Sequence, residues 1–205
     1  ADRDAQVVYQ PEQVAQVPGL EIRRGCVRRE HTEECARGVS HWCQGCFVKE
    51  LNLSPWSFAL QRATQHFGAE YIYKPGHRLA ISKQNLTPWT DGTTYFRTLF
   101  EQEFGHEFGQ AIANRYLKGQ SIAPHVDSER CFGPVIVTVS LGSSAIMRFS
   151  QAGKDVDVMV HGGDVVVMQG RARTEWRHSL VADRSAEFCR VSLTFRSVKE
   201  SAPWC

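Results

Sequence analysis

Two histidines and an aspartate are the residues of this sequence with the most specific chemistry. His125 and Asp127 stand two positions apart, and His178 follows downstream. Two imidazoles and one carboxylate on one side of a metal ion leave positions open for a chelating cosubstrate and dioxygen, as in non-haem Fe(II) oxygenases. Because side chains two apart share a face of a strand, we expect His125 and Asp127 at the end of one strand.

The third ligand must come from another strand, and two downstream histidines qualify. His161 directly precedes Gly162-Gly163-Asp164, a turn signal, which predicts an exposed hairpin tip. His178 lies between two expected strands, where a long-range partner fits. We therefore favour His178 and keep His161 as the alternative.

An arginine-bearing strand accompanies these ligands. Residues 190–196, RVSLTFR, alternate polar and apolar, so Arg190, Ser192, Thr194 and Arg196 share one face. Two arginines inside a barrel are costly unless they meet buried anions, and a dicarboxylate is a natural occupant. The alternative is the solvated face of an edge strand.

Short apolar runs separated by Gly, Pro and Asp must position these residues. They begin at about residue 111 and are predicted strands: Ala111–Tyr116, Val135–Leu141, Ala145–Phe149, Val156–Val160, Asp164–Met168 and Arg190–Phe195. This spacing predicts an antiparallel sandwich or barrel. The absence of a βαβ pattern, a P-loop and a GxGxxG motif argues against the common nucleotide-binding folds.

Three helix starts are expected in the first half of the chain. Thr32 precedes two glutamates, Ser54-Pro55-Trp56 places Pro at a first helical position, and apolar residues recur at helical spacing over Tyr95–Phe104. We expect these helices to buttress one side of the sandwich. Val137, Val139, Val166 and Leu193 are expected to wall the site against water.

Composition limits the broad class. The 205 residues are 42% hydrophobic and 22% charged, which suits one globular domain. The balance of 24 Lys and Arg against 22 Asp and Glu does not indicate a polyanionic partner. No apolar run approaches the roughly 20 residues of a membrane span, and no signal peptide is visible. We expect an intracellular protein of the cytoplasm or nucleus, and the sequence gives no sign of oligomeric state.

The chain resembles the AlkB-type Fe(II)/2-oxoglutarate-dependent dioxygenases. The resemblance rests on Asn114-Arg115-Tyr116, the His125-x-Asp127 pair, His178, and Arg190-x-Ser192-x-x-x-Arg196, in the family's order. Weaker similarity extends upstream through residues 17–20 and 65–75. The resemblance implies a single domain over residues 1–205, with N-terminal helices and a substrate lid over about 17–110. The fold class would be α+β, with a double-stranded β-helix, or jelly roll, of antiparallel strands over about 111–198.

The resemblance also assigns roles. His125, Asp127 and His178 would bind Fe(II), and Arg190 would pair with the distal carboxylate of 2-oxoglutarate. The remaining cofactor-binding residues would be Asn114, Tyr116, Ser192 and Arg196. The implied reaction consumes dioxygen and decarboxylates 2-oxoglutarate to succinate and CO2 while a substrate C–H bond is oxidised. An N-methyl group hydroxylated in this way leaves as formaldehyde.

The substrate is expected to be an alkylated base in RNA or DNA. The resemblance places the lid at residues 61–78, where aromatic residues are interleaved with Arg and Lys, a pattern that suits a flipped base and its phosphates. The candidate substrate residues are Gln65, His66, Phe67, Tyr71, Tyr73, Glu129, Arg130 and Arg177, with Arg171 and Arg173 extending a basic patch. The alternatives are hydroxylation of a modified tRNA wobble uridine and oxidation of a methylated protein side chain.

Seven cysteines suggest a second feature. Cys43-x-x-Cys46 can present two thiolates to one ion, and Cys26 and Cys35 could complete a zinc site. The spacing is not a standard finger, so reduced thiols are the simpler interpretation. A hypothesis of another class follows: a non-catalytic nucleic-acid or partner-binding module that carries a zinc-bound Cys/His segment.

Overall fold

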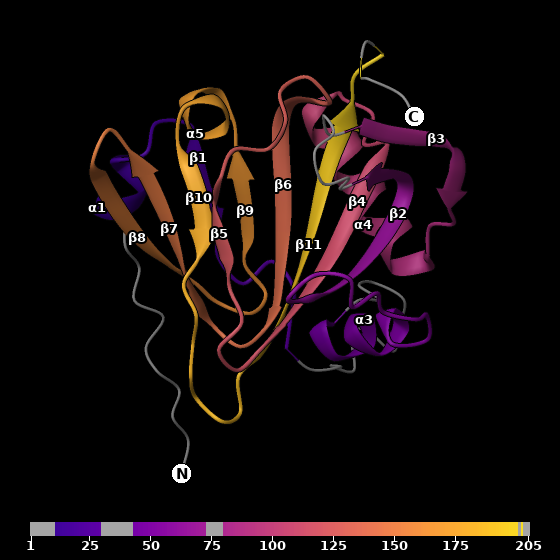
Figure 1. Ribbon diagram of the computed structural model, residues 1–205, viewed down its shortest axis with the longest axis horizontal. Coiled ribbons are helices and arrows are strands. Elements are labelled where there is room, and N and C mark those ends of the chain that lie inside the picture. The colour runs from indigo at the N-terminus through magenta and orange to yellow at the C-terminus, as the bar shows by residue number, and fades with distance from the viewer. Residues whose placement is uncertain (1–10, 30–42, 73–79, 201, 203–205) are drawn as a thin grey trace.

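The computed structural model describes residues 11–29, 43–72, 80–200 and 202, with the backbone alone for residues 71–72 and 80–85. Figure 1 shows the elements of this part of the chain. In order they are α1 (Pro11–Ala15), β1 (Leu20–Arg23), α3 (Gln44–Leu51), β2 (Ala63–Ile72), β3 (Ala80–Thr87), α4 (Asp91–Phe104), β4 (Gln110–Leu117), β5 (Ile122–His125), β6 (Phe132–Gly142), β7 (Ala145–Gln151), β8 (Lys154–Val160), β9 (Val165–Met168), α5 (Gly170–Thr174), β10 (Arg177–Leu180) and β11 (Cys189–Val198).

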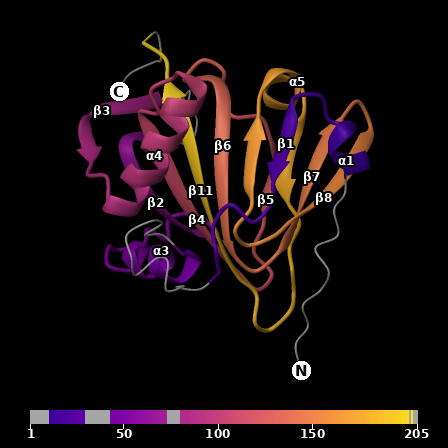
Figure 2. The same ribbon diagram turned by 180° about the vertical axis from the view of Figure 1, so that it is seen from behind.

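Two antiparallel sheets form the body of the protein. The larger has the order β1-β9-β6-β11-β4-β2-β3, and the smaller has the order β5-β10-β7-β8. The two sheets face each other, and α3 and α4 lie on the other side of the large sheet (Figure 2). This arrangement confirms the predicted jelly roll. All six strands predicted beyond residue 110 are present.

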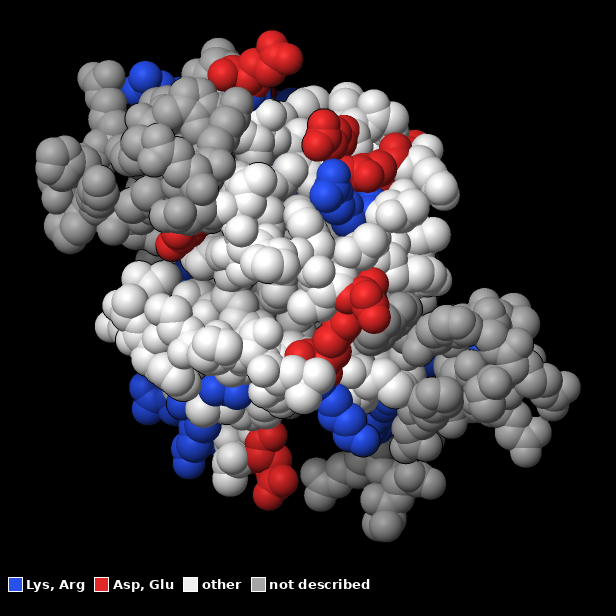
Figure 3. All heavy atoms as spheres, turned by 90° about the vertical axis from the view of Figure 1, so that its right-hand side faces the viewer, with Lys and Arg blue, Asp and Glu red and all other residues white. Residues whose placement is uncertain are grey.

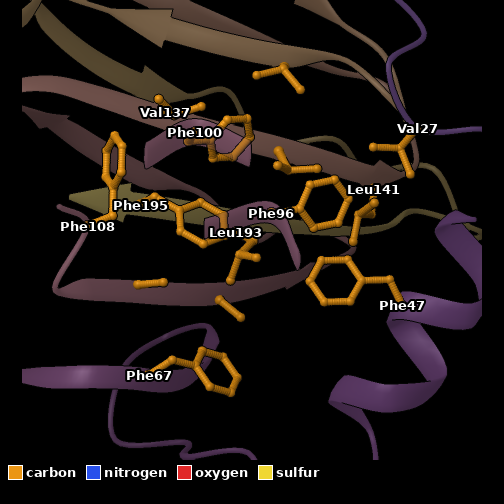
Figure 4. Packing of buried hydrophobic residues seen from close by; sticks show 14 of the residues in the cluster. Val27, Phe47, Phe67, Phe96, Phe100, Phe108, Val137, Leu141, Leu193 and Phe195 are labelled. Atoms are coloured by element: carbon orange, nitrogen blue, oxygen red, sulfur yellow. The ribbon is translucent and has the colours of Figure 1, made fainter. Parts of the chain in front are cut away.

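Each face of the large sheet has its own core. Phe47 of α3 and Phe96 and Phe100 of α4 pack against Phe195 and its neighbours (Figure 4). A second core, which includes Phe149, fills the space between the sheets. Strand alternation assigns Val137, Val139 and Leu193 to the helix-facing core, and only Val166 to the inter-sheet core. The expectation that all four wall the site is therefore wrong for the first three.

The predicted helices have different outcomes. The third is confirmed as α4, which begins at a capping box of Thr90 and Thr93 and ends at Gly105 with φ of 64°. The helix predicted from Ser54-Pro55 is wrong. Here the side-chain amide of Gln65 donates to the carbonyls of Leu51 and Ser54 at 2.7 and 2.8 Å, and the segment runs as a loop. Thr32 lies outside the described residues.

The first half of the chain also supplies strands that were not predicted. Residues 63–72, which fall in the expected lid, form β2, which pairs with β4 and lengthens the large sheet. The β3 strand then pairs with β2 at the edge. Within the described residues, no helix is both long and apolar enough to cross a lipid bilayer.

Candidate active site

His125, Asp127 and His178 converge between the two sheets. His125 ends β5 and pairs directly with His178 of β10, which places their ring centroids 4.3 Å apart. One ligand atom from each of the three residues lies within 4.8 Å of the others. Asp127 lies beyond the end of β5, so the expectation that one strand carries both ligands is wrong in detail. The loop that follows β5 must therefore hold the carboxylate.

Buried arginines hold Asp127 in place. Arg196 Nη2 donates to Oδ1 at 2.9 Å, and Arg173 Nη1 donates to the backbone carbonyl at 2.8 Å. Arg173 also donates to the carbonyls of Ser128 and Gly133 at 3.4 and 3.2 Å. Arg173 was expected in a surface basic patch, but its exposed fraction is 3%. The sequence carries no local signal for this role, because the carbonyls that it contacts lie 40 or more residues upstream.

Electrostatics favour the metal-binding forms of Asp127 and His178. Burial raises the pKa of Asp127, but the charges of Arg196 and the two histidines lower it by more. The net pKa of Asp127 therefore lies well below the usual range of a carboxyl. Burial is the main cause that lowers the pKa of His178 to about 4, against the effect of Asp127. The carbonyl of Ala123 lies 2.8 Å from Nδ1 of His125 and can only accept, so Nδ1 carries a proton and Nε2 is the nitrogen that can face a metal ion.

This donor set fits a divalent metal ion. Asp127 Oδ2 is buried without a hydrogen-bond partner and lies 4.0 Å from Nε2 of His178. A buried carboxylate oxygen without a hydrogen-bond partner is costly unless a cation completes its coordination. Two His and one carboxylate with open positions is the ligand set of non-haem Fe(II). His161 lies elsewhere, with its Nδ1 2.9 Å from the Ser144 hydroxyl.

A small cavity of about 50 Å³ is lined by the two histidines and by Arg190. All five residues expected to bind the cosubstrate line it: Asn114, Tyr116, Arg190, Ser192 and Arg196. Thr138 and Thr194, whose hydroxyls lie 3.0 Å apart, line it too. The cavity thus connects the metal ligands to a buried guanidinium.

Arg190 is a buried cation in need of an anion. Its exposed fraction is 2%, and its Nη2 donates to the Ser140 hydroxyl at 2.7 Å. Its Nε has no hydrogen-bond partner, and no carboxylate among the described residues forms an ion pair with it. Burial lowers the pKa of Arg190. A carboxylate entering the cavity would satisfy this group.

A wider cleft of about 560 Å³ is lined by two of the three ligands, His125 and Asp127. It shares Asn114, Ile122, His125 and Arg196 with the cavity and adds residues 60–62 and the loop around Asp127. Arg62 borders it, with Nε donating to Asn114 Oδ1 at 2.7 Å. Arg62 was not among the predicted site residues, although it lies in the expected lid, residues 61–78. The cleft can admit a substrate side group to the metal ligands.

The residues expected to bind substrate are scattered. Gln65 and Phe67 face the helix side of the large sheet, where Phe67 joins the core. His66 lines a separate hollow at the edge of β2. Burial, and to a lesser extent the charge of Arg196, lowers the pKa of His66 to about 4. Tyr71 is described by its backbone alone, and Tyr73 lies outside the described residues.

The remaining candidates lie beside the cleft. Glu129 and Arg130 are exposed just after its lining residue Ser128, and Arg177 Nη2 donates to the carbonyl of Pro124, another lining residue, at 2.6 Å. Arg171 is exposed and pairs with Glu175. These positions favour Glu129, Arg130 and Arg177 over the β2 residues.

The predicted zinc set is only partly described. Cys43 and Cys46 are adjacent, with their Sγ atoms 3.1 Å apart. Cys26 is exposed, and among the described residues it does not join them in a group of three metal-ligating side chains. Cys35 lies outside the described residues.

Comparisons with known proteins agree with this geometry. The family model of the 2OG-Fe(II) oxygenase superfamily matches residues 29–196. The chain is 32% identical over 130 residues to the tRNA (carboxymethyluridine(34)-5-O)-methyltransferase ALKBH8 of Macaca fascicularis, covering 58% of this chain and 18% of that protein. It is 24% identical over 133 residues to human alpha-ketoglutarate-dependent dioxygenase alkB homolog 3, covering 57% of this chain and 46% of the relative.

The fold has solved counterparts. The structure of OsALKBH1 superposes with a TM-score of 0.65 at 14% identity and covers 88% of this chain and 98% of that one. At this identity the likeness concerns the fold alone. The chain spans about a fifth of the length of the ALKBH8 relative, so the likeness to that protein concerns one part of it.

Proposed function

The chain belongs to the 2OG-Fe(II) oxygenase superfamily, within its AlkB type, and we propose that it oxidises alkylated bases in RNA or DNA. Membership makes it a dioxygenase with 2-oxoglutarate and dioxygen as co-substrates. The single observation that carries the site assignment is the cavity joining the His125, Asp127 and His178 ligands to the unneutralised Arg190. Oxidative removal of an N-methyl group as formaldehyde is the reaction that we favour.

Each residue has a proposed task. His125, Asp127 and His178 would hold Fe(II), and Arg196 keeps Asp127 ionised and oriented. Arg190, with Tyr116, Asn114 and Ser192 beside it in the cavity, would hold the distal carboxylate of 2-oxoglutarate. When bound, these cofactors supply the oxidising chemistry that yields succinate and CO2. Met147, Met168 and Leu180 give the cavity apolar walls that exclude water.

Positive charge at the cleft supports a nucleic-acid substrate. Arg62 lines the cleft, and Arg130 and Arg177 border it, so phosphates beside a bound base would meet guanidinium groups. Figure 3 shows a different face, beside β2, β3 and α4, whose centre carries few Lys or Arg side chains. Exposed apolar Leu86, Tyr95 and Leu99 belong to β3 and α4 on that side. Phosphate contacts are therefore better placed at the cleft than on that face.

A modified tRNA uridine is the second candidate substrate. The observation that favours it is the 32% identity to a protein whose name states action on carboxymethyluridine 34 of tRNA. Hydroxylation of such a base would leave a stable product, whereas N-methyl hydroxylation would release formaldehyde.

A substrate panel tests the proposal. The full chain is incubated with Fe(II), ascorbate and 2-oxoglutarate plus methylated RNA and DNA oligonucleotides, wobble-modified tRNA or methyl-lysine peptides. We expect loss of a methyl group from an oligonucleotide, with succinate formed in step. A gain of one oxygen on tRNA would favour the second candidate. Oxidation of the peptides alone would refute the nucleic-acid proposal, and absence of 2-oxoglutarate turnover in the wild type would favour a non-catalytic binding module.

A further inference from the structure

Cys43 and Cys46 form a close pair of thiols at the start of α3. Cys43 is the N-cap residue, and its Sγ accepts a hydrogen bond from the backbone N–H of Cys46 at 3.3 Å. The two Sγ atoms are 3.1 Å apart, only about 1 Å longer than a disulfide bond of roughly 2.05 Å. A small rotation of the side chains within one helical turn would bring the sulfurs to bonding distance.

The two sulfurs differ in accessibility. Cys43 is buried, with an exposed fraction of 3%, whereas Cys46 is half-buried. A small molecule from solvent therefore reaches Cys46 first. Cys43 lies behind it, already in contact, where it can attack a group attached to Cys46. This is the arrangement that a two-step thiol–disulfide exchange requires.

Electrostatics favour Cys43 as the second nucleophile. Burial raises the pKa of Cys43, but hydrogen bonds from the Cys46 thiol and from backbone N–H groups at the helix start outweigh it and lower that pKa. The Cys43 sulfur in turn raises the pKa of Cys46. The pair therefore loses its first proton mainly from Cys43. Cys46 can then become a thiolate by passing its own proton to the Cys43 sulfur, which lies 3.1 Å away.

We propose that Cys43 and Cys46 are a redox-active dithiol that exchanges with low-molecular-weight disulfides and thiols. Cys46 attacks a disulfide RSSR, forms a mixed disulfide and releases one RSH. Cys43 then attacks the Cys46 sulfur, forms the Cys43–Cys46 disulfide and releases the second RSH. The protein loses two electrons and two protons, and RSSR gains them. This site lies on α3, outside the residues that line the cavity and the cleft, and it does not depend on the proposed oxygenase function.

The choice of residue at the cap supports this assignment. Serine or threonine caps a helix well, so capping alone does not call for a thiol. The same reasoning provides a matched variant, because Cys43→Ser keeps an N-cap acceptor and removes the resolving sulfur. Cys26 is the control thiol, since it is exposed and its Sγ contacts the backbone carbonyls of Arg23 and Arg24 at 3.6 and 4.0 Å.

The test equilibrates the full chain in glutathione buffers of graded oxidised-to-reduced ratio and traps the thiols by alkylation. Trypsin then releases residues 38–49, a peptide whose only cysteines are Cys43 and Cys46. We expect this peptide to lose two hydrogens reversibly, at a ratio at least about tenfold more reducing than the one that modifies Cys26. The Cys43→Ser variant is expected to keep one glutathione on Cys46, with its circular dichroism unchanged.

Two results would overturn the proposal. One is a wild-type peptide that stays reduced or carries glutathione without losing two hydrogens. The other is one equivalent of zinc, measured by elemental analysis, that resists exchange until it is chelated and is absent from Cys43→Ser. The wild-type peptide decides the matter even if a variant fails to fold.

Discussion

Replacing Arg190 by methionine should damage 2-oxoglutarate binding far more than it damages the fold. Methionine keeps an unbranched side chain in the inter-sheet space and removes the guanidinium. In the protein without cosubstrate Arg190 is 2% exposed, and its Nη2 donates to the Ser140 hydroxyl. Losing a buried charge that lacks an anionic partner carries little cost, so we expect the melting temperature to change by only a few degrees.

The expected effect on the cosubstrate follows from the charge. Removing one partner of a buried charge pair costs about 2–5 kcal/mol. At about 3 kcal/mol the KM for 2-oxoglutarate rises roughly 150-fold, because each 1.4 kcal/mol is a factor of ten. Ser140→Ala, which removes a neutral hydrogen-bond partner of Arg190, should cost about 1 kcal/mol, or roughly fivefold.

The assay is succinate formation at graded 2-oxoglutarate concentrations. A monocarboxylic analogue that lacks the distal carboxylate, 2-oxobutyrate, gives a second readout. The wild type should prefer 2-oxoglutarate strongly, and Arg190→Met should lose most of that preference. An unchanged KM for 2-oxoglutarate in a folded Arg190→Met variant would refute the assignment of this cavity.

Three further perturbations follow from the same structure. Arg173→Met should weaken Fe(II) affinity about 10–100-fold, because Arg173 fixes the backbone at Asp127. Arg173→Lys should have an intermediate effect. Unchanged metal affinity, measured by titration, would contradict this. His66 has its pKa lowered to about 4, so the unfolded chain binds the extra proton and stability falls as pH decreases from 6.5 to 4. In urea unfolding of the metal-free protein, His66→Gln should lessen this loss by about 3 kcal/mol, and an identical pH dependence would count against it. Arg62→Ala should weaken binding of a substrate oligonucleotide and lower the salt slope by about 1, whereas Lys154→Ala on edge strand β8 should change neither.

Strand alternation made the jelly roll predictable from sequence. Residues 190–196 alternate between polar and apolar side chains, and β11 places Arg190 and Arg196 on the cavity side. The same alternation places Leu193 on the opposite face, so the prediction of Leu193 as a cavity wall conflicted with the pattern on which the arginines rested. Assigning alternate residues of every strand to opposite faces of the sheet would have removed that error.

The elements that were missed depend on distant contacts. The β5 and β10 strands are four residues long and carry two of the metal ligands, and such short runs give little periodic signal. The Ser54-Pro55 helix start failed because Gln65, more than ten residues away, holds the carbonyls there. Asp127 is held by arginines 46 and 69 positions downstream. Local sequence identified the reactive residues but not what supports them.

Anaerobic titration of Fe(II) into the protein with 2-oxoglutarate tests the central claim most directly. A 2-oxo acid chelated to Fe(II) produces a visible charge-transfer band, which reports binding without any substrate. We predict a band that saturates at one Fe(II) per chain in the wild type and is lost in His178→Ala. No band in the wild type, or an undiminished band in His178→Ala, would contradict the assignment of this site.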